Sequence, residues 1–342
     1  MFKGCYTALI TPFTPSLEID QAGLEKLVAF QLDQGVSGVL AVGTTGESPT
    51  LTWQEHDSVT ETVCSLVKGK AQSIAGTGSN STAETLRATE HAAHAGADAA
   101  LLVDPYYNGP SSLEIRKEYV EPVAKAFPNI QMIPYVIPGR SGTQLLPEDL
   151  GILSAEYPNV RTVKEATADY ENMARTRVCC GDDFTIMSGD DDKTFDMMTD
   201  ERIRSAGVIS VMSNVAPGSL QKMTEALLSG NRDEAERLRK AMVPLLGMVG
   251  VASEEETPYG VATVKARNPL PLKTLMNILG MPSGPCRRPL GKMNKAGLLI
   301  VLENARELQS QEPEIFAPIG EFFGVDIDSR LADETVIEGL AY

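Results

Sequence analysis

The sequence predicts an α/β protein built on a (β/α)8 TIM barrel with a C-terminal helical appendage. Over about the first 230 residues, eight short apolar runs alternate with stretches of helical spacing, which is the pattern of repeated βα units. An open doubly wound sheet is the alternative fold. No G-x-G-x-x-G motif follows the first apolar run to support that alternative.

Eight strands are predicted from the β-branched and other apolar residues of these runs. They cover Tyr6–Thr11, Gly38–Val42, Ser73–Gly76, Ala99–Val103, Gln131–Val136, Val160–Glu165, Phe184–Ser188 and Gly207–Val211. Pro134 lies inside the fifth strand, and proline has no backbone N–H to donate to a sheet. We therefore expect that strand to be irregular.

A helix is predicted after each strand, and Asp20 is the expected N-cap of the first one. These helices cover Gly23–Gln34, Trp53–Val67, Asn80–Ala95, Leu113–Phe127, Leu146–Tyr157, Tyr170–Val178, Lys193–Ser205 and Pro217–Leu228. After residue 230 the pattern is interpreted as wholly helical, over Arg232–Val249, Gly260–Leu279 and Lys292–Gln309. The predicted division is a barrel over 1–230, a helical region over 231–310 and an acidic extension over 311–342, either ordered or partly mobile.

The composition bounds the class of protein and its partners. Of 342 residues, 42% are hydrophobic and 22% are charged, as in a soluble globular protein with an ample core. The formal net charge of −16 argues against nucleic acids and anionic membranes as partners. There is no signal peptide and no apolar run long enough to span a membrane, so a cytoplasmic location is expected.

Cysteine and histidine usage argues against a disulfide framework and a metal site. The cysteine count is odd, the spacings are wide and no C-x-x-C occurs, which is typical of free thiols in a reducing compartment. The cysteines are Cys5, Cys64, Cys179, Cys180 and Cys286. His91 and His94 lie on a predicted helix without a nearby cysteine. We interpret them as part of an exposed polar face and expect no metal.

Lys164 stands near the end of the predicted sixth strand, after the β-branched residues Val160, Thr162 and Val163. Lysine is rarely buried, because removing an ammonium group from water costs free energy. Burial lowers its pKa and makes the nucleophilic amine available near neutral pH. Lys164 is therefore a candidate Schiff-base lysine. The alternative is a lysine that extends from the strand end into solvent.

The carboxyl ends of barrel strands supply the catalytic residues of this fold. Here they offer Thr44, Thr45, Tyr106, Tyr107, Tyr135, Arg140, Lys164, Gly189, Asp190, Asp191 and Ile209. Taken singly, a tyrosine can pack at the rim and Arg140 can form a loop ion pair. Together, an amine, hydroxyl groups and a carboxylate-binding arginine suit imine chemistry on a 2-oxo acid, with a phenol moving protons and the iminium acting as electron sink.

The motifs at these strand ends resemble those of the dihydrodipicolinate synthase / N-acetylneuraminate lyase family of class I aldolase barrels. They are G-T-T-G-E-S at 43–48, P-Y-Y-N at 105–108, Y-V-I-P-G-R-S-G at 135–142, V-K-E-A-T at 163–167, S-G-D-D at 188–191 and G-V-I-S-V at 207–211. They occur in the family's order and spacing over about residues 1–300. The segment after about 310 resembles an addition.

The resemblance implies a condensation of pyruvate with aspartate 4-semialdehyde on the route to lysine, with no cofactor beyond the covalent imine. Lys164 is implied as the Schiff-base residue and Tyr135 as the proton shuttle, linked through Thr44 to Tyr107. In the family this last tyrosine reaches in from a neighbouring subunit, which implies a dimer and usually a tetramer. The substrate-binding residues implied are Thr45, Arg140, Gly189 and Ile209.

A feedback site for lysine is also implied by the resemblance, at a dimer interface. The matching residues are Ser48, Pro49, Trp53, His56, Asn80, Glu84 and Tyr106. Glu84 suits an α-ammonium group, while Asn80 and Tyr106 suit a carboxylate. The alternative is an interface that binds no ligand.

Three other functions are weighed against this one. Another pyruvate-dependent aldolase or lyase, acting on a sugar acid, is disfavoured by Arg140 after Pro-Gly. A non-catalytic sensor barrel is disfavoured by the intact catalytic set. A phosphate-binding isomerase is disfavoured because Asp190 and Asp191 follow the seventh strand, where such barrels bind phosphate. The chain departs from the family at Val136, where asparagine is frequent, but strand alternation turns this side chain outward.

Overall fold

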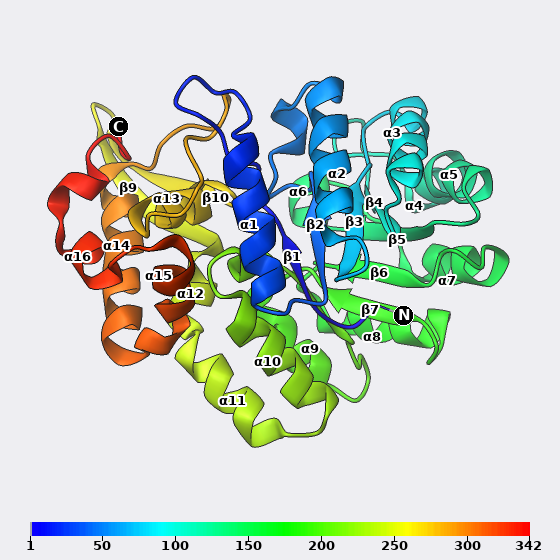
Figure 1. Ribbon diagram of the computed structural model, residues 1–342. Coiled ribbons are helices and arrows are strands. Elements are labelled where there is room, and N and C mark those ends of the chain that lie inside the picture. The colour runs from blue at the N-terminus through cyan, green and yellow to red at the C-terminus, as the bar shows by residue number, and fades with distance from the viewer. Residues whose placement is uncertain (1) are drawn as a thin grey trace.

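The computed structural model describes residues 2–342, so Met1, the first residue of the predicted barrel, lies outside it. Eight parallel strands close into one barrel, with β1 paired to both β2 and β8. This confirms the predicted fold (Figure 1). The strands are β1 (Gly4–Ala8), β2 (Gly38–Ala41), β3 (Gln72–Gly76), β4 (Ala99–Val103), β5 (Gln131–Val136), β6 (Thr162–Glu165), β7 (Thr185–Ser188) and β8 (Gly207–Ser210).

The strand predictions for β4 and β5 match the structure at both ends, whereas the first strand forms earlier than predicted. The apolar run continues beyond Ala8, where the Leu9 amide still donates to the Leu40 carbonyl of β2 at 3.0 Å before the chain leaves the sheet. Leu9 and Ile10 are buried in the layer between barrel and helices, and the Ile10 amide donates to the side chain of Asn214 at 3.1 Å. Burial outside the sheet thus gives the same apolar signal as a strand.

Strand β5 runs through Pro134 without a break on its β4 side, where Pro134 is paired with Leu102. Its ladder with β4 has five residue pairs, whereas its ladder with β6 has only two, Tyr135 with Lys164 and Val136 with Glu165. Alternation along β5 also holds. Tyr135 faces the barrel interior and Val136 packs in the layer between barrel and helices. The departure from the family at Val136 therefore lies outside the barrel interior.

Helices cover the outside of the barrel, and the helix predicted at Trp53–Val67 matches the structure at both ends. The barrel helices are α1 (Gln21–Asp33), α2 (Trp53–Val67), α3 (Thr82–Ala95), α4 (Ser112–Glu114), α5 (Glu121–Ala126), α6 (Pro138–Ser141), α7 (Pro147–Glu156), α8 (Tyr170–Cys180), α9 (Thr194–Thr199) and α10 (Pro217–Leu228). Asp20 caps α1 by accepting from the Gly23 amide at 2.9 Å. A π-helical turn, Ile115–Val120, joins α4 to α5. The helix predicted over Lys193–Ser205 is wrong after Thr199, where the chain turns and Arg204 has a φ of 51°.

The region after the barrel contains a β-hairpin, so the wholly helical prediction is wrong. Strands β9 (Gly250–Thr257) and β10 (Gly260–Arg267) pair antiparallel along their full length. The predicted helix Gly260–Leu279 is helical only in α13 (Leu270–Ile278). Two features of the sequence explain the difference: Pro258 and Gly260 favour the turn, and residues 261–264 include β-branched side chains that fit a strand better than a helix.

The first remaining helix, α11 (Arg232–Ala241), packs beside α10 (Figure 1). On the α1 side of the barrel lie the hairpin and the other helices, which are α12 (Val243–Leu246), α14 (Lys295–Gln311), α15 (Ala317–Phe323) and α16 (Ile327–Ala332). The acidic extension folds into helices that pack against α1. Its Phe322 and Phe323 rings lie 5.3 and 5.2 Å from the Phe30 ring of α1, and Phe316 is fully buried. The domain boundaries at 230 and 310 stay predictions.

None of the helices in residues 2–342 combines the length and the apolar character needed to cross a membrane.

Candidate active site

Lys164 points into the barrel near the carboxyl end of β6. Its neighbour Val163 packs outward against the helices, so the alternation of the strand directs Lys164 inward. Only 4% of the residue is exposed, which excludes the solvent-extended alternative. Burial lowers the pKa of Lys164 to about 8, against the opposing effect of Asp191 and Asp190. This change corresponds to about 3 kcal/mol disfavouring the ammonium form, and it leaves a usable fraction of free amine near neutral pH.

Tyr135 lies against this lysine from the adjacent strand. The two residues are paired in the β5–β6 register, and the Lys164 Nζ is 4.3 Å from the centroid of the Tyr135 ring. Burial raises the pKa of the Tyr135 phenol, whereas Arg140 and a hydrogen bond with Thr44 lower it. The phenol therefore stays protonated at neutral pH and can act as an acid beside the amine.

Two backbone segments complete the surroundings of Lys164. Gly189 follows β7, and a Cβ on it would lie 3.2 Å from the Lys164 Cε and 2.8 Å from the Ala166 Cβ, so a glycine suits this close approach. Ile209 of β8 is buried in the barrel interior. Beyond it, Asp191 accepts hydrogen bonds from the Ser210 hydroxyl and from the amides of the next two residues, which fixes the end of β8.

The loop after β2 carries Thr44 and Thr45 and begins with unusual backbone geometry. Val42 has a φ of 48°, which is strained for a β-branched residue. Thr45 is buried, and its hydroxyl accepts a hydrogen bond from the Asn268 side chain at 3.0 Å. Thr44 is half-buried and lines a cavity of about 230 Å³ that Tyr135 and Arg140 also line. The loop therefore presents one hydroxyl to the cavity and anchors the other.

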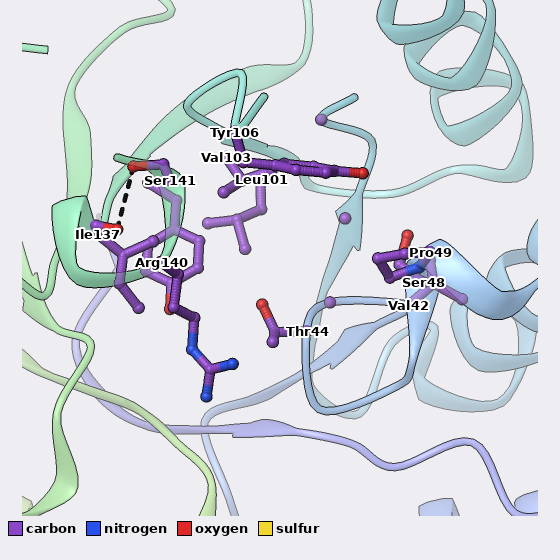
Figure 2. A pocket seen from close by; sticks show the side chains of 14 residues that line it. Val42, Thr44, Ser48, Pro49, Leu101, Val103, Tyr106, Ile137, Arg140 and Ser141 are labelled. Carbon is purple, nitrogen blue, oxygen red and sulfur yellow. Dashed lines mark hydrogen bonds between the residues drawn. The ribbon is translucent and has the colours of Figure 1, made fainter. Parts of the chain in front are cut away.

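Arg140 lies on the short helix α6, directly after β5. Its guanidinium and the Thr44 side chain face the same cavity, and the Tyr106 ring forms another wall (Figure 2). The Arg140 Nη2 donates to the Asn268 carbonyl at 3.3 Å. Ser141 stabilises the turn by donating to the Ile137 carbonyl at 3.0 Å. A cation fixed at the cavity wall is suited to binding a substrate carboxylate.

Two of the predicted catalytic residues do not line this cavity: Lys164, which lies against the Tyr135 ring, and Tyr107. Tyr107 follows β4, but 86% of it is exposed, and its neighbour Tyr106 lines the cavity instead. Within this chain, the predicted proton-relay hydroxyls at the cavity are therefore those of Thr44 and Tyr135. The predicted role of Tyr107 requires a second subunit.

A second cavity, of about 190 Å³, gathers most of the predicted lysine-binding residues. It is lined by Ser48, Pro49, Trp53, His56, Glu84 and Tyr106 among others. Asn80 lies at its edge, where its side-chain oxygen accepts from the Tyr106 amide at 2.7 Å. Ser48, Pro49 and Tyr106 line both cavities, so the two share a wall.

Asn268 is a candidate site residue that the sequence analysis missed. It lies between β10 and α13 and is buried, and it contacts Thr45 through its side chain and Arg140 through its carbonyl. Within residues 2–342, its Oδ1 has no hydrogen-bond partner, which is unusual for a buried acceptor. The sequence feature that could have indicated this residue is the Asn-Pro pair at 268–269, because such a pair marks a turn inside the stretch predicted to be helical.

Comparisons with known proteins show which family the chain resembles. The protein-family model described as "Dihydrodipicolinate synthetase family" matches residues 1–305 of this chain. A protein of Syntrophus aciditrophicus named 4-hydroxy-tetrahydrodipicolinate synthase is 39% identical over 295 residues, which are 86% of this chain and 94% of that protein.

Two solved structures are similar in fold and sequence. A lysine-bound dihydrodipicolinate synthase of Cyanidioschyzon merolae has a TM-score of 0.80 and 34% identity, and the match covers 90% of this chain and 98% of that one. A pyruvate complex of the chloride-inhibited dihydrodipicolinate synthase of Acinetobacter baumannii has a TM-score of 0.79 and 28% identity. The match covers 95% of this chain and 100% of that one.

Proposed function

The chain belongs to the dihydrodipicolinate synthetase family, and on that premise we propose that it condenses pyruvate with aspartate 4-semialdehyde to give 4-hydroxy-tetrahydrodipicolinate. The reaction is that of a class I aldolase-type lyase and leads toward lysine and diaminopimelate. The observation that carries the proposal is the buried Lys164 amine against the Tyr135 ring. The five cysteines are free thiols, which supports a reducing, cytoplasmic location.

The first step forms the imine. The neutral Lys164 amine attacks the C2 carbonyl of pyruvate, and the oxygen leaves as water after protonation. Tyr135 supplies that proton, because its phenol stays protonated and lies beside the amine. Thr45 holds the pyruvate carboxylate through its hydroxyl hydrogen, which stays available because the oxygen only accepts from Asn268. No cofactor is required, because the iminium itself withdraws electrons from C3.

The second step joins the carbon atoms. Loss of a C3 proton to Tyr135 gives an enamine, whose C3 attacks the aldehyde carbon of the semialdehyde while the phenol protonates the new alkoxide. Arg140 holds the carboxylate of the semialdehyde. The α-amino group of this substrate then attacks the imine carbon, which closes the ring and releases Lys164 as a free amine.

Tyr107 supports an oligomeric enzyme in this proposal. Its exposure and its place outside the chain's own cavity fit a side chain that enters a neighbouring subunit. There the Tyr107 hydroxyl extends the proton relay that runs from Tyr135 through Thr44. A homodimer is the smallest assembly with this arrangement, and a dimer of dimers is the proposed tetramer.

Replacing Arg140 tests the aldehyde partner. With the Arg140→Ala variant, we expect KM for aspartate 4-semialdehyde to rise about 10- to 100-fold, because a charge-assisted hydrogen bond contributes roughly 1.5–3 kcal/mol. The pyruvate KM should change little. The product is measured by mass spectrometry with aspartate 4-semialdehyde and, separately, with N-acetylmannosamine. Arg175→Ala, which removes an exposed ion pair with Glu148, is the matched control. Faster turnover of the sugar aldehyde than of the semialdehyde would assign the chain to the lyase branch of the family.

We further propose that free lysine inhibits the enzyme from the second cavity. Glu84 lines this cavity, and its carboxylate accepts from the Ser79 hydroxyl, which leaves acceptor capacity for an ammonium group. Millimolar L-lysine is expected to lower the initial rate of the wild-type enzyme. Glu84→Ala should abolish this inhibition, whereas Glu90→Ala, an exposed change on the same helix, should retain it. An unchanged wild-type rate at saturating lysine would eliminate the effector site.

A further inference from the structure

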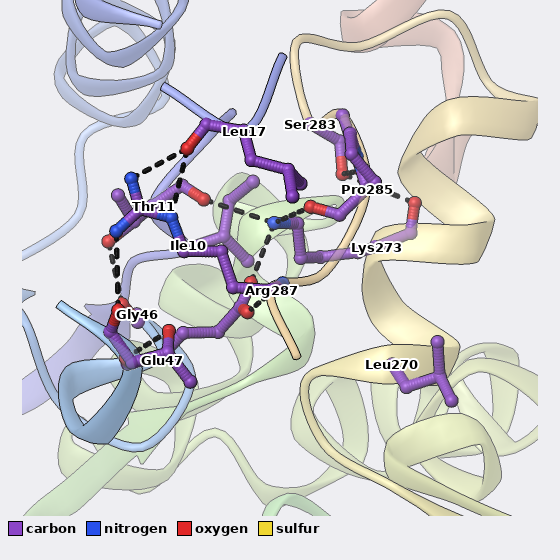
Figure 3. A network of polar contacts seen from close by, with 12 residues as sticks. Ile10, Thr11, Leu17, Gly46, Glu47, Leu270, Lys273, Ser283, Pro285 and Arg287 are labelled. Atoms are coloured by element: carbon purple, nitrogen blue, oxygen red, sulfur yellow. Dashed lines mark hydrogen bonds and ion pairs between the residues drawn. The ribbon is translucent and has the colours of Figure 1, made fainter. Parts of the chain in front are cut away.

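Lys273 is a buried lysine that the proposed chemistry does not use. It lies on α13, and 1% of it is exposed. Its ammonium group donates to the Glu47 carboxylate at 2.7 Å, to the Thr11 carbonyl at 3.1 Å and to the Pro285 carbonyl at 2.9 Å. Figure 3 shows these contacts converging on one nitrogen. All three ammonium hydrogens thus have acceptors, so the group is held in one place.

Glu47 is equally fixed at the other end of this ion pair. Its side chain is fully buried. One carboxylate oxygen accepts from Lys273 and the other accepts from the Arg287 amide at 2.8 Å. The backbone of Glu47 has a φ of 57°, in the left-handed region that non-glycine residues seldom adopt. Such a conformation persists only where the surroundings impose it, and the side-chain contacts of Glu47 with Lys273 and Arg287 come from the C-terminal region.

The ion pair lies directly behind the proposed pyruvate-binding loop. Glu47 is two residues from Thr45 and three from Thr44, and the loop begins at the strained Val42. The start of α13 therefore holds this loop at two points. Asn268 donates to the Thr45 hydroxyl, and Lys273 donates to Glu47.

We propose that Glu47 and Lys273 are positioning residues that set the place of Thr44 and Thr45 for pyruvate. This inference rests on the proposed function, because that function assigns Thr45 to the pyruvate carboxylate and Thr44 to the proton relay beside it. A buried ion pair is a poor device for stability alone, since desolvation of both charges offsets their attraction. As a link of fixed length between α13 and the loop, the ion pair determines where the two threonines lie. Small displacements of a binding group have large effects on reaction rate.

The test compares Lys273→Met with a control of similar burial. Pyruvate is titrated with sodium borohydride present, and the concentration for half-maximal adduct formation is measured together with both KM values. We expect the half-maximal pyruvate concentration and the pyruvate KM to rise on the order of 10- to 100-fold. The semialdehyde KM should stay within about twofold, because Arg140 does not contact the ion pair.

The matched control is Arg177→Met. Arg177 is also buried and also donates to several backbone carbonyls, including those of Phe184 and Ile203, but these lie before β7 and β8, at the opposite end of the barrel. Its loss should lower the melting temperature and leave both KM values unchanged. A Lys273→Met enzyme with wild-type pyruvate affinity would overturn the inference.

A second variant serves if Lys273→Met does not fold. Glu47→Gln keeps the shape of the side chain but replaces one acceptor with a donor, so it loses either the Lys273 or the Arg287 contact. The same rise in the half-maximal pyruvate concentration is expected, and an unchanged value would contradict the inference. If the wild-type enzyme itself forms no adduct, the proposed function fails and takes the positioning role with it. Normal wild-type trapping with unaffected variants overturns the positioning role alone.

Discussion

Lys164→Ala is expected to abolish the reaction, with a loss of turnover on the order of 10⁴–10⁶. The reason is that Lys164 supplies the only amine directed at the Tyr135 ring within the described residues, and without it no imine forms. Alanine leaves the surrounding shell of buried side chains in place, and the removed ammonium was itself disfavoured by burial. The folded state should therefore survive the substitution.

The measurement is intact-mass spectrometry after adding pyruvate and sodium borohydride. The wild-type chain should gain the mass of a reduced pyruvyl adduct, and Lys164→Ala should gain none. Lys193→Ala is the matched control, because Lys193 lies on the following strand-end segment and is part-exposed beside Asp192; it should trap pyruvate normally. Adduct formation in Lys164→Ala would show that another amine carries the chemistry.

Tyr135→Phe is expected to slow turnover by about 10²- to 10⁴-fold, the usual contribution of one proton-transfer group. Phenylalanine keeps the ring against Lys164 and removes only the hydroxyl. Imine trapping should become slower but still reach the wild-type adduct mass, because the lysine nucleophile remains. Pre-steady-state trapping with pyruvate, followed by the rate of product formation, separates the two steps.

The control for this variant is Tyr170→Phe. Tyr170 begins α8, and its hydroxyl donates to Asp196 at 3.3 Å, away from the cavity. Its loss should change neither trapping nor turnover. Turnover of Tyr135→Phe at the wild-type rate would mean that the protons move through another group or through water.

The barrel could be predicted because its signal is local. Runs such as Ala99–Val103 and Gln131–Val136 are apolar on both faces, since each parallel strand is buried on both sides. Lys164 and Tyr135 could be placed together for the same reason. They stand at the ends of adjacent strands, and the topology alone makes them neighbours.

The remainder of the site depends on contacts that no local pattern encodes. Asn268 reaches Thr45 across 223 positions and Lys273 reaches Glu47 across 226. The hairpin was missed because apolar residues in 260–279 also fit helical spacing, although Pro269 and Pro271 are poorly suited to a helix interior. Tyr107 illustrates a different limit, because its predicted role lies in another copy of the chain.

The contact between Glu47 and Lys273 also has a consequence for the order of events during protein synthesis. A growing chain can have all eight barrel strands outside the ribosome while α13 is still inside the exit tunnel or not yet made. Until that helix emerges and docks, the left-handed Glu47 lacks its charged partner and Thr45 lacks Asn268. The loop must therefore be fixed late, by a closure of very long range.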